Sequence, residues 1–208
     1  MKMRRSTALV AILTVATIAT ARPALATEVS FTDGAEDAYR VPGTVGSPPP
    51  AQPPSSLLSD PSADILEAGF ANTEGRSGPN HRSYSASMTI TGPADGSYSY
   101  VVAGEFGPDC QLYHLLTPGT TSVANAFCGS GETRRFIGQI AGSAVTQSGN
   151  TLTATYTYIV KKLPAELRGD TELGPLFAFT CVSGLEGRGC RPEEVLDSAT
   201  GLEKTFTI

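Results

Sequence analysis

Apolar and polar residues alternate with a period of two over many short segments of this chain. In residues 151–160, threonines take every second position as far as Thr157, and apolar residues from Leu152 to Val160 lie between them. Residues 84–91 alternate in the same way before a Gly-Pro-Ala-Asp-Gly turn. Because successive side chains of a strand point to opposite faces, this alternation predicts β-strands with one buried face and one wet face.

Other segments rich in Val, Ile, Tyr and Phe predict further strands, and the Ser-Gly-Asn triplet at 148–150 predicts a hairpin turn. The segment 163–167 allows one helical turn begun by Pro164. Eight or nine short strands predict an all-β fold, namely a disulfide-stapled, two-sheet antiparallel β-sandwich, immunoglobulin-like or jelly-roll-like, with a closed barrel as the alternative. The further strands are expected at 65–71, 97–103, 111–116, 122–127, 135–140, 176–181 and 205–207.

The first 26 residues have the organisation of a secretory signal peptide. A basic start leads an uncharged run, and Ala24-Leu-Ala26 offers a small-x-small cleavage site. The uncharged run is too short for a comfortable membrane span. We therefore expect a signal peptide at 1–26, a single domain at 27–208 with no membrane span, and a product that is secreted, either extracellular or associated with the cell envelope.

A proline-rich segment interrupts the strand pattern at 42–56. Proline removes the backbone donor that a ladder needs, so this segment is expected to be an exposed loop. A recognition segment is the alternative interpretation.

Four cysteines in an exported chain favour disulfides over free thiols. A hairpin centred on Gly119 would place Cys110 opposite Cys128, and the glycine-rich segment between Cys181 and Cys190 lets the chain double back. We expect these two sequential pairs, each contributing about 2.5–3 kcal/mol by chain entropy. The gaps within the pairs are too wide for a typical zinc site.

Charge limits the choice of partner. Removal of the signal peptide would take away four basic residues and leave 11 basic against 20 acidic residues, a net charge of −9. Nucleic acids and anionic membranes require a basic footprint, so neither is expected as a partner. We expect a monomer whose partner is an extracellular glycan or protein.

No established catalytic motif occurs in the chain. A triad would have to use one of two histidines, His81 in a polar loop or His114 in a strand, where a structural role is commoner. Paired carboxylates could serve glycoside hydrolysis, but the lack of tryptophan argues against it. A small hydrolase therefore stays an alternative, and its candidate loop carboxylates are Glu132, Glu166, Asp170 and Glu172.

An acidic group near the start of the expected domain could bind calcium. Hard oxygen ligands from two loops can surround Ca²⁺, although no EF-hand pattern occurs. Ordinary turn chemistry is the alternative explanation. The candidate ligands are Asp33, Glu36, Asp37, Asp60 and Asp64. No other cofactor is expected.

The opening Phe31-Thr-Asp-Gly-Ala-Glu-Asp-Ala38, followed by a proline-rich gap and Ala63-Asp-Ile65, resembles uncharacterised secreted bacterial β-sandwich proteins. It is less similar to carbohydrate-binding and DOMON-like sandwich modules. The chain departs from the first pattern at Glu36, where glycine would stand. The resemblance implies a fold and an export route.

The sequence thus predicts a secreted, non-catalytic β-sandwich module that binds a glycan or an envelope protein. The alternatives are a small extracellular hydrolase and a secreted inhibitor or effector that inserts the loop between Cys181 and Cys190 into a target.

Overall fold

The computed structural model describes residues 28–33, 64–73, 80–92, 94, 98–107, 109–168, 172–182, 195–201 and 205–208. Almost all of them belong to antiparallel strands. The expected signal peptide and the proline-rich segment lie outside the described residues. The strands are β1 (Glu28–Thr32), β2 (Ile65–Asn72), β3 (His81–Ile90), β4 (Tyr98–Phe106), β5 (Cys110–Leu115), β6 (Thr121–Cys128), β7 (Arg135–Ala144), β8 (Thr146–Ser148), β9 (Thr151–Ile159), β10 (Glu172–Leu173), β11 (Leu176–Val182), β12 (Val195–Gly201) and β13 (Phe206–Thr207).

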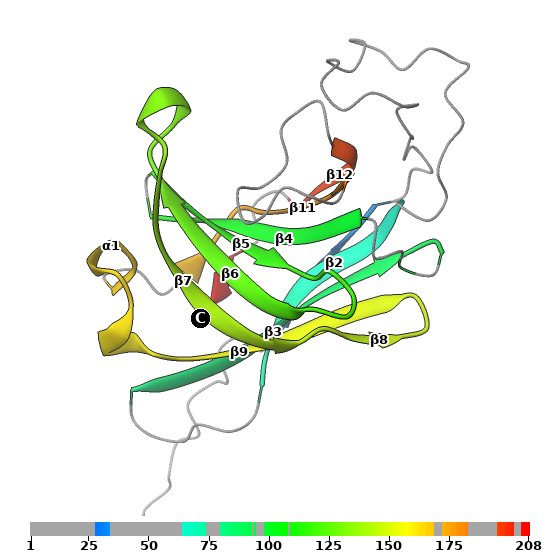
Figure 1. Ribbon diagram of the computed structural model, residues 1–208, viewed down its shortest axis with the longest axis horizontal. Coiled ribbons are helices and arrows are strands. Elements are labelled where there is room, and N and C mark those ends of the chain that lie inside the picture. Colours follow the sequence, from blue (N-terminus) through cyan, green and yellow to red (C-terminus); the bar gives the residue numbers. More distant parts are fainter. Residues whose placement is uncertain are drawn as a thin grey trace, which may run out of the picture.

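Eleven of these strands form one continuous sheet in the order β1-β2-β3-β9-β7-β6-β5-β4-β11-β12, with β8 paired to β9. The sheet bends back on itself and is nearly barrel-shaped (Figure 1). Its two halves join through a single register pair between β7 and β9, Gly142 with Tyr156. The all-β, antiparallel and disulfide-stapled parts of the expectation are confirmed. Separation into two sheets is not confirmed, because hydrogen bonding runs from one half into the other.

The two ends of the long sheet approach each other. The backbone N–H of Ile65, at the start of β2, donates to Oδ2 of the buried Asp197 in β12 at 2.7 Å. A second, two-stranded sheet of β10 and β13 places Leu173 and Phe206 in the core, where the Phe206 ring lies 5.5 Å from that of Phe70. These contacts stabilise the curved sheet in addition to the backbone hydrogen bonds between its neighbouring strands.

The core contains several aromatic side chains that carry polar atoms. His114 on β5 is fully buried, with Nδ1 2.9 Å from the carbonyl oxygen of Val102 and Nε2 2.8 Å from the hydroxyl of Tyr84 on β3. A carbonyl oxygen only accepts, so Nδ1 carries the proton and Nε2 accepts from Tyr84. Burial lowers the pKa of His114 to about 3. This neutral histidine therefore connects the two halves of the sheet.

A second buried hydroxyl pair lies beside this histidine. Ser122 and Tyr156 approach to 2.5 Å, and the hydroxyl of Ser122 also donates to the carbonyl oxygen of Leu115. The His114 ring lies edge-on to Tyr156, with centroids 4.9 Å apart. Satisfied hydrogen bonds let these polar groups stay inside at little cost.

One short irregular segment covers the sheet near β7. The 3₁₀ turn η2 (Val160–Lys162) and helix α1 (Ala165–Arg168) place Leu163 and Leu167 in the core. A Cβ at Gly138 of β7 would lie 2.6 Å from Pro164, so this position requires glycine. The helical turn predicted after Pro164 is confirmed. No helix among the described residues is long and apolar enough to cross a membrane.

Candidate functional site

Only part of the predicted calcium set falls on described residues. Asp33 follows β1 and Asp64 precedes β2, at the same end of that strand pair, since the Asp33 N–H donates to Leu66 at 3.1 Å. Glu36, Asp37 and Asp60 lie outside the described residues. Within the described ranges, no three His, Cys, Asp or Glu side chains gather closely enough to hold a metal ion. Calcium binding stays a prediction.

The predicted pairing of Cys110 with Cys128 is confirmed. Cys110 and Cys128 are register partners on β5 and β6 and form a disulfide. Cys181 is buried and disulfide-bonded. Cys190 lies outside the described residues, so its pairing with Cys181 stays a prediction.

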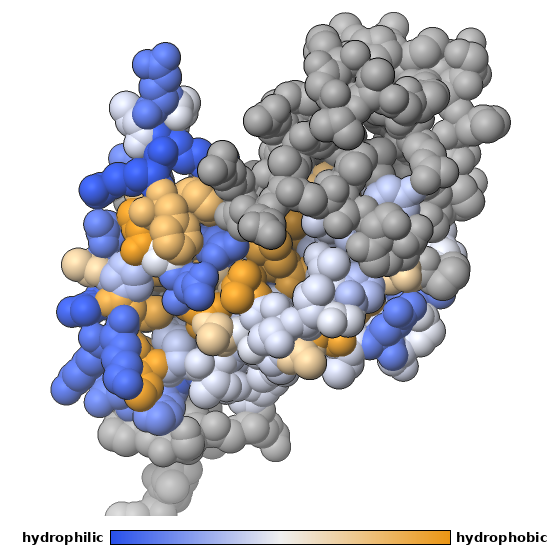
Figure 2. All heavy atoms as spheres, in the orientation of Figure 1, coloured by the Kyte–Doolittle hydropathy of each residue, from blue (hydrophilic) through white to orange (hydrophobic). Residues whose placement is uncertain are grey.

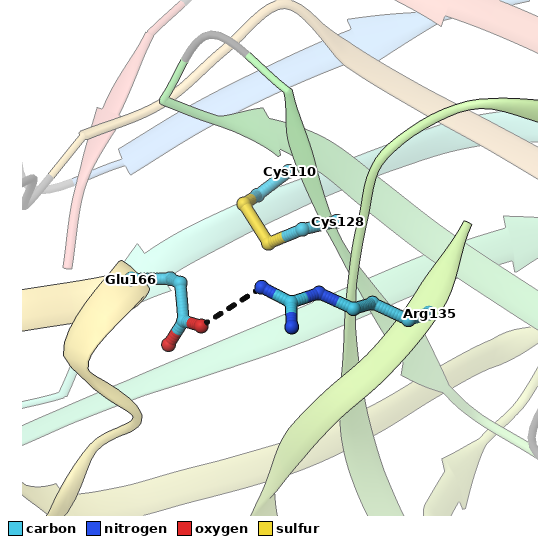
Figure 3. The surroundings of a disulfide bond; sticks show 4 residues. All are labelled: Cys110, Cys128, Arg135 and Glu166. Carbon is cyan, nitrogen blue, oxygen red and sulfur yellow. Dashed lines mark hydrogen bonds and ion pairs between the residues drawn. A yellow bond between two sulfur atoms is a disulfide. The ribbon is translucent and has the colours of Figure 1, made fainter. Parts of the chain in front are cut away.

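The catalytic candidates occupy separate elements. His81 begins β3, Glu132 lies in the 3₁₀ turn η1 (Gly131–Thr133), and Glu172 lies in β10. Arg135 on β7 pairs with Glu166 of α1 at 3.4 Å, beside the Cys110–Cys128 disulfide (Figure 3). Asp170 and the loop between Cys181 and Cys190 are not among the described residues. His114 has the structural role expected of a strand histidine, with complete burial.

A second apolar cluster lies on the outside of the sheet, opposite the core. Val101, Ala103 and Tyr113 are buried there, each at most 7% exposed, although they point away from the main core. Partly buried apolar side chains from β5, β6 and β11 cover them. We call this surface the aromatic face and define it as Val101, Ala103, Tyr113, Leu115, Phe127, Phe177 and Phe179.

Strand register explains how the aromatic face assembles. Phe177 pairs with Ala103 and Phe179 with Val101 across β11 and β4, while Tyr113 pairs with Ala103 across β4 and β5. The rings of Phe177 and Phe179 are nearly parallel, at 14°, with centroids 6.2 Å apart. The Tyr113 ring stands at 77° to Phe177. Small residues on β4 therefore leave room for rings from both neighbouring strands.

An arginine lies over one end of the aromatic face. The guanidinium carbon of Arg134 is 5.1 Å from the Tyr113 ring centroid and 4.7 Å from that of Phe127. Phe136 follows two residues later, 54% exposed and 5.5 Å from Phe127. Burial raises the pKa of Tyr113, and the positive charge of Arg134 opposes that rise. Figure 2 shows apolar side chains among hydrophilic ones over β6 and β7.

A polar pocket adjoins this end of the aromatic face. Its cavity measures about 350 Å³, and the disulfide end of the β5–β6 pair forms part of its wall. The Tyr113 hydroxyl, at the edge of the face, donates to Oε1 of Gln111 in the pocket wall. We call this cavity the disulfide-end pocket. Its lining residues are Glu105, Gly107, Asp109, Cys110, Gln111, Gly129, Ser130, Gly131 and Arg134.

The opposite half of the sheet has an outer face of another kind. Serines and threonines of β3 pair across the ladder with threonines of β9, as in Ser83 with Thr157 and Thr89 with Thr151. Both of these pairs are within hydrogen-bond distance through their hydroxyls, at 3.1 and 2.9 Å. We call this surface the hydroxyl face and define it as Ser83, Ser85, Ser87, Thr89, Thr151, Thr153, Thr155 and Thr157.

Comparison with protein-family models, with curated proteins and with solved structures finds no match for this chain. The resemblance to secreted β-sandwich proteins stays a prediction from the residues alone.

The aromatic face is not among the features predicted from the sequence. A signal was present, since residues 176–179 read Leu-Phe-Ala-Phe and residues 100–103 read Tyr-Val-Val-Ala, without alternation. An uninterrupted apolar strand indicates burial on both faces. Compared with β3 and β9, which alternate, such strands mark a part of the sheet whose outer face is covered as well.

Proposed function

We propose that this protein is a secreted, non-catalytic binding module and that its ligand is an extracellular glycan held on the aromatic face. The proposal includes the fold class: the two halves of the curved sheet pack against each other as the two layers of a β-sandwich. The expected export and acidic net charge agree with a partner outside the cell that carries no strong negative charge.

The observation that carries the proposal is the aromatic face with the disulfide-end pocket beside it. Ligand sites are mostly apolar surfaces with a few placed polar groups. Sugar rings present C–H groups on their faces, which pack against aromatic rings, and hydroxyls at their edges, which need hydrogen-bond partners. The parallel rings of Phe177 and Phe179 offer the first kind of contact. Glu105, Gln111 and Arg134 offer the second.

The position of this surface also favours recognition over a purely structural role. Apolar patches that stay partly exposed on a protein surface are typical of ligand-binding and partner-binding sites. Phe136 is the most exposed large apolar side chain of the described residues and lies at the edge of the face, against Phe127. A ligand that crosses the aromatic face would reach it.

Direct binding measurements with ring-preserving and ring-removing variants test this proposal. Phe177→Leu with Phe179→Leu keeps apolar cover over Val101 but removes both rings, while Phe177→Tyr with Phe179→Tyr keeps them. A panel of soluble and insoluble polysaccharides identifies the ligand. We expect the leucine pair to lose at least about tenfold in affinity, which is about 1.4 kcal/mol, and the tyrosine pair to bind nearly as the natural chain does.

A matched control comes from the hydroxyl face. Thr153→Val with Ser87→Ala changes two paired outward positions of another part of the same sheet. Its binding should be unchanged. Equal affinity of the leucine pair and the natural chain would refute the aromatic face as the site, and a blank panel would refute glycan binding.

A further inference from the structure

The disulfide-end pocket is lined by two acidic residues and one basic residue. The side chains of Glu105 and Asp109 line the cavity and make no ion pair within the described part of the chain. Arg134 also lines it, but its guanidinium lies over the rings of Tyr113 and Phe127. The pocket therefore offers a ligand two acidic groups and one guanidinium, so acidic groups outnumber basic ones in its wall.

Gln111 and Arg134 add hydrogen-bond donors to the wall. Oε1 of Gln111 accepts from the Tyr113 hydroxyl, so the NH₂ group of this amide stays available for other acceptors. The guanidinium of Arg134 has five N–H groups and no acceptor. Together the wall offers carboxylate oxygens for a cation and N–H groups for hydroxyl oxygens.

Resting on the glycan function proposed above, we propose that the disulfide-end pocket selects a sugar unit that carries a free amino group. The ammonium group supplies three donors and a positive charge for Glu105 and Asp109, while the hydroxyl oxygens of the same unit accept from Gln111 and Arg134. An N-acetylated or neutral sugar offers no charge to the carboxylates. The remaining sugar units of the glycan lie on the aromatic face. Arg134 contacts this face and also lines the pocket, so the two surfaces are continuous.

The cavity volume suits this assignment. A volume of about 350 Å³ lies at the lower end of the usual range for small-molecule sites. Exposed carboxylates at its rim make the attraction to a cationic unit sensitive to salt. Salt dependence therefore distinguishes charge-based selection in the pocket from stacking on the aromatic face.

Three oligosaccharides of equal length test the proposal with the full chain in its oxidised form. They are a glucosamine hexamer with free amines, its N-acetylated counterpart and a neutral glucose hexamer. The natural chain should bind the free-amine hexamer at least about tenfold more tightly than the other two, and less tightly as salt increases. Glu105→Gln with Asp109→Asn should remove this preference and leave the affinity for the other two unchanged.

Glu132→Gln is the matched control, since it removes a carboxylate from the neighbouring turn but not from the pocket lining. It should keep the preference. Equal binding of all three hexamers, with loss on removal of the Phe177 and Phe179 rings, would overturn the amino-sugar assignment and leave the glycan function standing. No binding of any glycan would overturn both, and binding of a lysine-rich peptide without the free-amine hexamer would overturn the assignment in favour of a protein partner.

Discussion

The two outer faces of the sheet differ although both belong to antiparallel strands that cover one core. Between Ser83 and Thr89 on β3 and between Thr151 and Thr157 on β9, the outward positions are all serine or threonine, and this row pairs one hydroxyl residue with another. On β4, β5 and β11 the outward positions hold Val101, Tyr113 and Phe179, which shield one another from water. Figure 2 shows pale residues of intermediate hydropathy over β9.

This difference separates what the fold requires from what it does not. The inward row of each half is mostly apolar because it builds the core, and its buried polar residues such as His114 and Ser122 are hydrogen-bonded. The outward row is free to be polar, as the hydroxyl face demonstrates. The rings of the aromatic face are thus not needed to make strands, and the glycan function we propose accounts for their presence.

The largest expected effect comes from removing the centre of the aromatic face. Tyr113 is 7% exposed and lies beneath Phe127, Phe177 and Arg134. Tyr113→Ala should lower the free energy of unfolding by about 3–5 kcal/mol, because it leaves a cavity under these side chains. Thr153→Ala on the hydroxyl face should cost at most about 1 kcal/mol. Denaturant unfolding of both variants checks this contrast, and equal losses would show that the two faces contribute alike to stability.

The disulfide should affect the two halves unequally. Cys110→Ala with Cys128→Ala removes the link between β5 and β6, at a cost of about 3 kcal/mol by the chain-entropy estimate. Amide hydrogen exchange should accelerate first in β5 and β6, next to the disulfide-end pocket. Simultaneous acceleration in β3 and β9 would contradict this local effect.

Low pH should destabilise both halves of the sheet together, because the buried His114 connects them. Its pKa is about 3 in the folded chain and near 6.5 when unfolded, so between these values the unfolded state binds more protons. The contribution of neutral His114 to the free energy of unfolding is fully present above about pH 6.5. It declines as the pH falls and is lower by about 2–3 kcal/mol at pH 4.5. Unfolding of the natural chain and of His114→Gln, measured across this range, should show a steeper loss for the natural chain. Parallel curves would show that His114 does not carry the effect.

Much of the fold could be predicted because alternation reports directly on strands with one buried face. β3, β9 and the β5–β6 hairpin follow from it, as does the Cys110–Cys128 pair, since two positions equally far from a turn become register partners. The alternation does not predict β1, β8, β10 or β12. These strands are short or polar, and each one depends on pairing with a neighbouring strand, which is β2, β9, β13 and β11, respectively.

The site was harder to predict because no catalytic or metal motif marks it. The rings of Tyr113 and Phe179 come from strands that are distant in sequence and meet only through the register of β4 with both neighbours. The disulfide-end pocket joins Glu105 at the end of β4 to Arg134 beyond β6. Such juxtapositions follow from topology, which local patterns do not encode.

Amide chemical-shift mapping during titration with a bound oligosaccharide tests the central claim most directly. We predict that the perturbed signals belong to the aromatic face and the disulfide-end pocket, including Gln111, Tyr113, Phe177 and Arg134, and that Ser85, Ser87 and Thr153 stay unchanged. Perturbation of the hydroxyl face without the aromatic face would contradict the account.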